Sequence, residues 1–99
     1  MSCYIYLYDK NNEELPCPAM EVSSDHEGVK LTDKAKINSL LSKISSELCV
    51  KKLSAREREA ILTKRWRGEI VTPQERDAIN LEWVQNLVNR PDFARLECG

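Results

Sequence analysis

The sequence predicts a small α+β domain in which an N-terminal β-hairpin is followed by three α-helices. Two observations lead to this order. Residues 3–8 alternate between two faces as a strand does, whereas from Thr32 onward the apolar side chains recur at helical spacing. The chain has 99 residues, no internal repeat and no linker long enough to separate two units. We therefore expect residues 1–99 to form a single domain.

The first predicted strand covers residues 3–8, and its two faces differ in kind. One face carries Cys3, Ile5 and Leu7, and the other carries Tyr4, Tyr6 and Tyr8. Asp and Asn residues then favour a turn, and residues 15–22 are the expected return strand. Because Pro16 and Pro18 lack an N–H group, that strand must be irregular or lie at an edge. Residues 29–31 are too short to assign, although a third strand would fit there.

The remaining chain divides into three predicted helices, over residues 33–49, 54–67 and 72–89. The first has one apolar face of about 100°, which suits packing against a sheet. The second and third each open with a Ser/Thr-x-x-Glu capping box. A glycine after the second and a proline after the third mark their ends. Residues 92–98 would add one last helical turn.

The ends and the cysteines of the chain bear on its compartment. No basic segment followed by an apolar stretch opens the sequence, and no run approaches the ~20 apolar residues that span a bilayer. We therefore expect a cytoplasmic protein without membrane contact. The four cysteines form no C-x-x-C pair: Cys3, Cys17, Cys49 and Cys98. This spacing favours reduced, mostly buried thiols over a zinc site or a disulfide.

No motif in the sequence indicates catalysis. The single histidine, His26, follows Asp25 in a polar loop, and we interpret it as a solvated residue rather than a general base. The three glycines stand far apart, so no phosphate-binding loop is present. No acidic cluster has the spacing of a calcium loop. We predict no catalytic residue, no metal and no cofactor, and hence a protein that is not an enzyme.

Charge is distributed unevenly, although the net charge is only −1. Residues 1–31 carry −4 and residues 68–99 carry −3, whereas residues 51–67 carry +5. The basic side chains of that segment are Lys51, Lys52, Arg56, Arg58, Lys64, Arg65 and Arg67. One interpretation is a phosphate-contacting surface, as in a small DNA- or RNA-binding protein. The other is a solvated helix that forms ion pairs with the acidic segments.

Helical geometry favours the second interpretation of the basic segment. At about 100° per residue, Arg58 and Arg65 fall together, while Arg56 and Arg67 fall nearly opposite. The cations therefore form a collar around the helix. In a helix-turn-helix, moreover, the third helix would present Glu75 to the phosphates.

The apolar side chains of the second and third helices cover more surface than one small core easily uses. Either the sheet and the first helix bury both helices, or some apolar surface is left for a partner. Those of the third helix spread over about 200°, twice the arc of the first. Trp and Arg are enriched at binding hot spots. We therefore predict a partner-binding surface formed by Arg58, Lys64, Arg65, Trp66, Arg67 and Trp83.

The tyrosine face of residues 3–8 leaves three alternatives open. If the helices cover the opposite face, Tyr4, Tyr6 and Tyr8 are exposed in a row. They could stack nucleic-acid bases, contact a protein or simply cover the hairpin. No glycine-aromatic RNA-binding motif accompanies them, which makes base stacking the weakest alternative.

Taken together, these features predict a non-enzymatic interaction module that docks on and modulates a larger cytoplasmic protein complex. The expected partner is one that handles nucleic acid. Accessory or inhibitor proteins that mobile elements and phages direct against host nucleic-acid enzymes have this size and character, which is an analogy only. Direct binding of DNA or RNA through residues 51–67 is the alternative.

Overall fold

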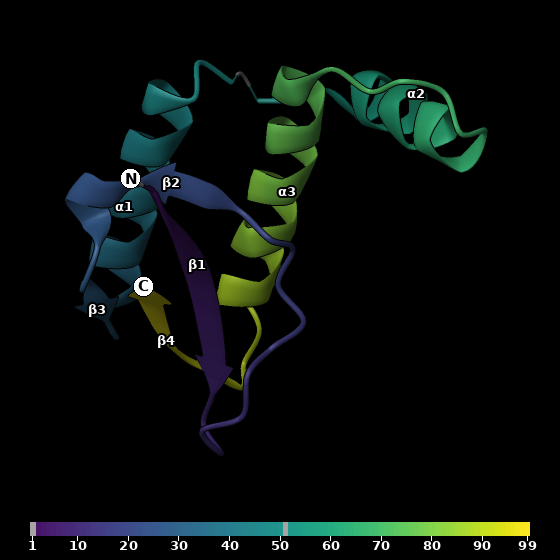
Figure 1. Cartoon of the computed structure of the whole chain (residues 1–99). Helices are drawn as coiled ribbons and strands as arrows, with labels where there is room; N and C mark the ends of the chain where they lie inside the picture. The colour runs from purple at the N-terminus through teal and green to yellow at the C-terminus, as the bar shows by residue number, and fades with distance from the viewer. Residues whose placement is uncertain (1, 51) are drawn as a thin grey trace.

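The computed structural model describes residues 2–50 and 52–99 and has the predicted α+β architecture (Figure 1). The described residues form a four-stranded antiparallel sheet and three α-helices. In chain order the elements are β1 (Ser2–Asp9), β2 (Glu21–Ser23), the short 3₁₀ helix η1 (Ser24–His26), β3 (Lys30–Leu31), α1 (Lys34–Glu47), α2 (Ala55–Trp66), α3 (Pro73–Val88) and β4 (Phe93–Cys98). Lys51, part of the basic segment, lies outside the described residues.

The sheet has the strand order β2–β1–β4–β3, so the first and last strands pair at its centre. The prediction of a helical turn over residues 92–98 was therefore wrong. The register between β1 and β4 shifts between Tyr8 and Asp9. Phe93, which pairs with Asp9, is buried although it lies three residues from the buried Leu96. This irregularity interrupts the alternation by which a strand is recognised.

The predicted hairpin is present, but its return strand is much shorter than residues 15–22. β2 has three residues, paired with the start of β1. The segment before β2 contains Pro16 and Pro18 and runs beside β1 with isolated hydrogen bonds, such as Leu15 N–H to Leu7 O at 2.8 Å. Two missing N–H groups explain why no continuous ladder forms there. A third strand does form, as β3, and it pairs with β4 rather than with the hairpin.

The three helices lie where the sequence predicts them. Ser54 and Thr72 each accept a hydrogen bond from the third residue of their helix, and both capping boxes are complete. Asp33 caps α1 by accepting a hydrogen bond from the Ala35 N–H. Gly68 follows α2 with a φ of +75°, a left-handed conformation that glycine adopts without strain.

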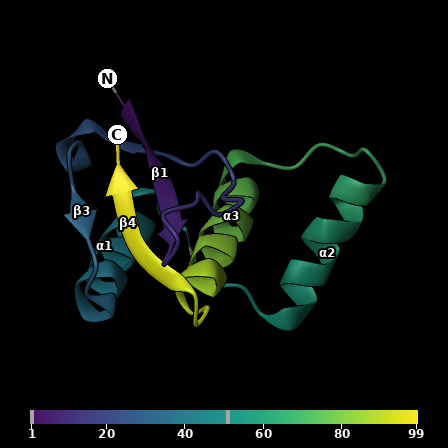
Figure 2. The same ribbon diagram turned by 90° about the horizontal axis from the view of Figure 1, so that it is seen from below.

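α1 and α3 lie on one face of the sheet and enclose the core (Figure 2). The aliphatic face of β1 is buried against them, as predicted. Side chains with at most 1 % of their surface exposed include Leu7, Ile37, Leu41, Ile44, Val84, Val88 and Leu96. The opposite face of the sheet, which carries the tyrosines, has no helix over it in either view (Figures 1 and 2).

α2 stands apart from this core (Figures 1 and 2). Ile61 is its only buried residue. α3 is consequently covered on two sides, because Leu81 and Val84 face the core while Ile79 is buried outside it, on the side of α2. This arrangement accounts for much of the wide apolar arc predicted for the third helix.

Candidate functional site

Two ion pairs join α2 to α3, and the buried Ile61 lies between their cations in sequence. Arg58 pairs with Glu82, and Lys64 Nζ lies 3.3 Å from a carboxylate oxygen of Glu75. Ile61, midway between the two cations in sequence, is 4 % exposed. Arg58, Ile61 and Lys64 are three residues apart on α2, so they lie on one side of that helix. Glu75 and Glu82 are seven residues apart on α3 and likewise share one side. The attachment is polar at both ends, and hollows open on either side of it.

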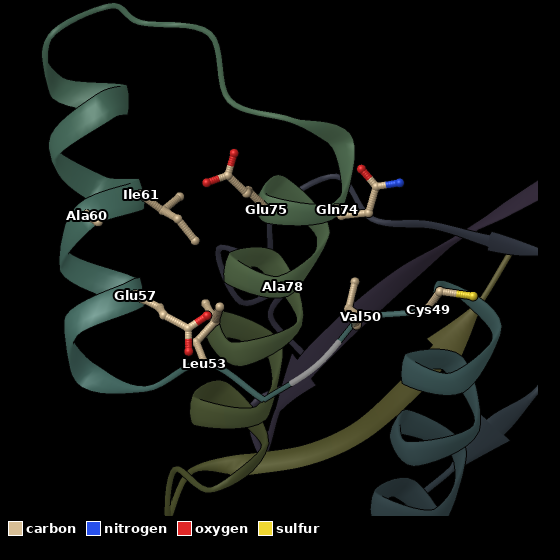
Figure 3. Close-up of a pocket in the computed structure, with 9 residues that line it drawn as sticks. All are labelled: Cys49, Val50, Leu53, Glu57, Ala60, Ile61, Gln74, Glu75 and Ala78. Atoms are coloured by element: carbon tan, nitrogen blue, oxygen red, sulfur yellow. The ribbon is translucent and has the colours of Figure 1, made fainter.

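The larger hollow, which we call the α2–α3 groove, has a volume of about 370 Å³ (Figure 3). Its apolar lining comes from Val50, Leu53, Ala60, Ile61 and Ala78. Glu57 and Glu75 line it as well, and both carboxylates are engaged in the capping boxes. The close-up shows Leu53 and Ile61 directed from the α2 side towards α3. The groove is therefore an apolar gap between two helices.

The second hollow lies on the other side of α2 and has a volume of about 160 Å³. Leu62 and Trp83 both line it, and they are 44 % and 43 % exposed. Trp66 lies one turn beyond Leu62 and is 88 % exposed. We call Leu62, Trp66 and Trp83 the tryptophan surface. Ile70, in the connection between α2 and α3, is 92 % exposed. We call α2 and this connection, residues 55–72, the arm.

The structure separates the six predicted partner-binding residues into two groups. Arg58 and Lys64 pair with carboxylates of α3, which is the ion pairing expected of a collar of cations. Trp66 and Trp83 are both exposed, as is Arg65, whereas Arg67 is the C-cap of α2. The sequence reasoning did not select Leu62 or Ile70. The spacing of four residues, which places Leu62 and Trp66 on one side of α2, could have identified Leu62.

Three cations of the arm have no ion pair among the residues that the structure describes: Arg56, Arg65 and Arg67. At about 100° per residue, Arg56, Ala60 and Arg67 fall within about 40° of one another on α2. Ala60 is exposed and borders the α2–α3 groove. Arg56 and Arg67 do not line the groove, whose charged lining residues are Glu57 and Glu75.

The tyrosine row lies on the open face of the sheet and is partly engaged. Tyr4 and Tyr6 are 39 % and 36 % exposed. The guanidinium of Arg95 lies 4.2 Å from the centre of the Tyr8 ring and pairs with Glu97 at 2.6 Å. Tyr8, Arg95 and Glu97 are therefore engaged with one another on this face.

His26 was wrongly predicted to be solvated. It is 4 % exposed, and its Nε2 lies 3.0 Å from Glu47 at the end of α1. The ionised carboxylate can only accept, so the Nε2–H donates. The partner is distant in sequence, and among the described residues the Asp25 side chain makes no hydrogen bond to the ring.

The cysteines differ in environment. Cys3 and Cys98 are buried, Cys17 is half-buried and Cys49 is exposed, so the prediction of mostly buried thiols was wrong for Cys49. Burial, followed by the effect of Glu14, raises the pKa of Cys17 to about 11. Burial also raises the pKa of Cys98 to about 11 and shifts that of Cys3 upward. Within residues 2–50 and 52–99, no three metal-ligating side chains cluster.

Comparisons with known proteins found no matching family model, no matching curated protein and no matching solved structure. None of the helices in the described part of the chain is long and apolar enough to cross a membrane.

Proposed function

We propose that the chain is a non-enzymatic interaction module that docks on a larger cytoplasmic protein complex through the tryptophan surface and modulates it. The observation that carries the proposal is the exposure of Leu62 and Trp66 on α2, which stands apart from the core, and of Trp83 on α3, which lines the same hollow as Leu62. Monomeric proteins rarely leave several large apolar side chains together in solvent unless they serve binding. Trp is also the residue most enriched at binding hot spots.

The charges of the arm support a protein partner over nucleic acid. Arg58 and Lys64 are held by Glu82 and Glu75, which lowers the positive charge available to phosphates. Arg56 and Arg67 lie on the opposite side of α2 from Arg65. A nucleic-acid backbone would meet only part of this collar at once.

The compartment and the kind of partner are proposed from other features of the chain. The buried thiols of Cys3 and Cys98, which pack as small apolar side chains, suit a reducing compartment such as the cytoplasm. A partner that handles nucleic acid is proposed from the small size and uneven charge of the chain alone, by analogy.

Affinity capture from a lysate, with and without nuclease, tests the proposal. The double variant Trp66→Ala with Arg65→Ala should lose the captured complex while its circular-dichroism spectrum stays unchanged. Tyr4→Ala is the control, because the exposed fraction of Tyr4 is close to that of Trp83 but Tyr4 lies on the sheet. The proposal fails if the double variant captures the same proteins as the wild type, or if nuclease abolishes capture.

A further inference from the structure

One exposed face of α2 carries apolar and charged side chains in a regular order. At about 100° per residue, Glu59 and Trp66 fall within about 60° of Leu62 on one side, and Arg65 lies about 60° from Leu62 on the other. All four side chains are exposed. Among residues 2–50 and 52–99, neither Glu59 nor Arg65 has an ion pair. This face therefore offers a partner an apolar centre and two unpaired charges of opposite sign.

The other cations of α2 do not oppose a partner on this face. Arg58, which lies on the same side, is already paired with Glu82 of α3. Arg56 and Arg67 fall more than about 100° from Leu62, on the other side of the helix. α2 also projects beyond α3, away from α1 and the sheet (Figures 1 and 2). Another molecule can therefore reach this face without meeting the core of the chain.

The order of the charges is self-complementary under a two-fold axis. Glu59 lies three residues before Leu62, and Arg65 lies three residues after it. When two copies of α2 cross in antiparallel orientation at Leu62, Glu59 of each copy comes level with Arg65 of the other, within reach of their long side chains. Two opposite-charge pairs then form around the contact between the leucines. In a parallel two-fold arrangement Arg65 would instead face Arg65, which is unfavourable.

The same crossing provides a place for the indole of Trp66. Trp66 and Arg58 lie four residues after and before Leu62, so Trp66 of one copy comes level with Arg58 of the other. Arg58 lines the second hollow together with Leu62 and Trp83. An indole laid over this hollow loses its own contact with water and covers part of Trp83. A guanidinium beside an indole is itself a favourable contact.

We propose that two copies of the chain associate through the tryptophan surface, with α2 of one packed antiparallel to α2 of the other about a two-fold axis at Leu62. The leucines and tryptophans supply the buried apolar area, and the two Glu59–Arg65 pairs select the orientation. Because each copy contributes little more than one helix, we expect a dissociation constant of about 100 µM. A docking partner and a second copy compete for this surface, but the dimer is inferred from the charges of α2 and does not rest on the proposed function.

Sedimentation equilibrium of the purified full chain, from about 10 µM to about 1 mM, tests the proposal. The wild type should change from monomer to dimer over this range, whereas Trp66→Ala should remain monomeric. Glu59→Arg and Arg65→Glu should each weaken association at least about fivefold, because either homodimer then contains two like-charge pairs.

Mixing the two charge variants is the sharpest measurement. In a mixed dimer one copy supplies two arginines at these positions and the other supplies two glutamates, so both pairs regain opposite charge. An equimolar mixture should therefore associate about as tightly as the wild type, although neither variant does so alone. The chain that carries both substitutions should recover in the same way.

Matched controls separate this pairing from an effect of net charge. Glu13→Arg and Lys36→Glu make the same changes of charge at exposed positions outside α2 and should leave association unchanged. Circular dichroism of each variant should match that of the wild type, because all four substituted positions are exposed.

Three outcomes would overturn the proposal. The first is a wild-type chain that is still monomeric at about 1 mM. The second is a mixture that associates no better than its two components, which would mean that Glu59 and Arg65 do not meet. The third is equal weakening by the control variants. Lysate capture that persists without self-association would sink the dimer alone, and self-association without capture would sink the proposed function alone.

Discussion

The Nε2 atom of His26 lies 3.0 Å from a carboxylate oxygen of Glu47, and this contact ties η1 to the last turn of α1. The imidazole is 4 % exposed, whereas the Glu47 side chain reaches solvent. A buried ring that loses its charged partner is left with an unsatisfied polar group. The contact therefore fixes where α1 ends relative to the sheet.

His26→Ala should lower the free energy of unfolding by about 2 kcal/mol, because it removes both a buried ring and a hydrogen bond to a charged group. Urea denaturation followed by circular dichroism measures the change. The adjacent Asp25→Ala, at an exposed position, should cost less than about 0.5 kcal/mol. Equal effects of the two variants would mean that His26 is not held as described.

Glu75 gives the chain a defined sensitivity to acid. The hydrogen bond to the Thr72 backbone, then that to the Thr72 hydroxyl, and then Lys64 hold the pKa of Glu75 below its ordinary value. Since the folded pKa is the lower one, the ionised side chain stabilises the fold above the unfolded pKa of about 4.3, and this contribution is lost as the pH falls through the folded pKa.

Glu75→Gln should therefore destabilise the chain at pH 7 and make little difference near pH 2. Urea denaturation of both proteins at a series of pH values gives the difference directly. A difference between the two proteins that stays constant from pH 7 to pH 2 would contradict the capping role of the carboxylate.

Thiol labelling should be selective for one cysteine. The thiolate is the reactive species, and a thiol with a pKa of about 11 is roughly one part in a thousand ionised at pH 8. Cys17 and Cys98 have such values, and Cys3 is buried. Cys49 is exposed. Brief iodoacetamide treatment should give a single adduct by mass spectrometry, which Cys49→Ser should abolish; rapid labelling of Cys98 would show that the sheet opens readily.

Truncation to alanine should lower the stability of the chain strongly at Leu96 and very little at Trp66. Leu96 is fully buried in the central strand β4, and Leu96→Ala should cost about 3 kcal/mol. Trp66 is 88 % exposed, and Trp66→Ala should change stability by less than about 0.5 kcal/mol. Thermal or urea unfolding of the two variants checks this. Comparable losses would mean that Trp66 packs against the core.

Local patterns in the sequence predicted the local features of the fold. The capping boxes at Ser54 and Thr72 placed α2 and α3, and the alternation of residues 3–8 placed β1 and its buried face. β4 was not predicted, because the alternation of buried and exposed residues along it is short. Only Leu96 and Cys98 keep the two-residue period, and the register shift at Asp9 puts Phe93 out of phase.

The candidate site was predictable in part for the same reason. The sequence placed Trp66 and Arg65 in the expected contact surface but left a core position for Trp66 open, and both side chains are exposed. The ion pairs of Arg58 and Lys64 depend on where α3 lies, which a helical pattern does not specify. The groove between the two helices follows from how loosely α2 is attached, and the pairing of His26 with Glu47 joins residues far apart in sequence.

The pairing of β1 with β4 at the centre of the sheet has a kinetic consequence. During synthesis β1 leaves the ribosome well before its central neighbour, with all three helices made in between. Closing a loop of that length costs conformational entropy before any strand contact repays it. We therefore expect the helices to form early and the sheet to complete late, so that refolding has a slow step which Leu96→Ala retards and Trp66→Ala leaves unchanged.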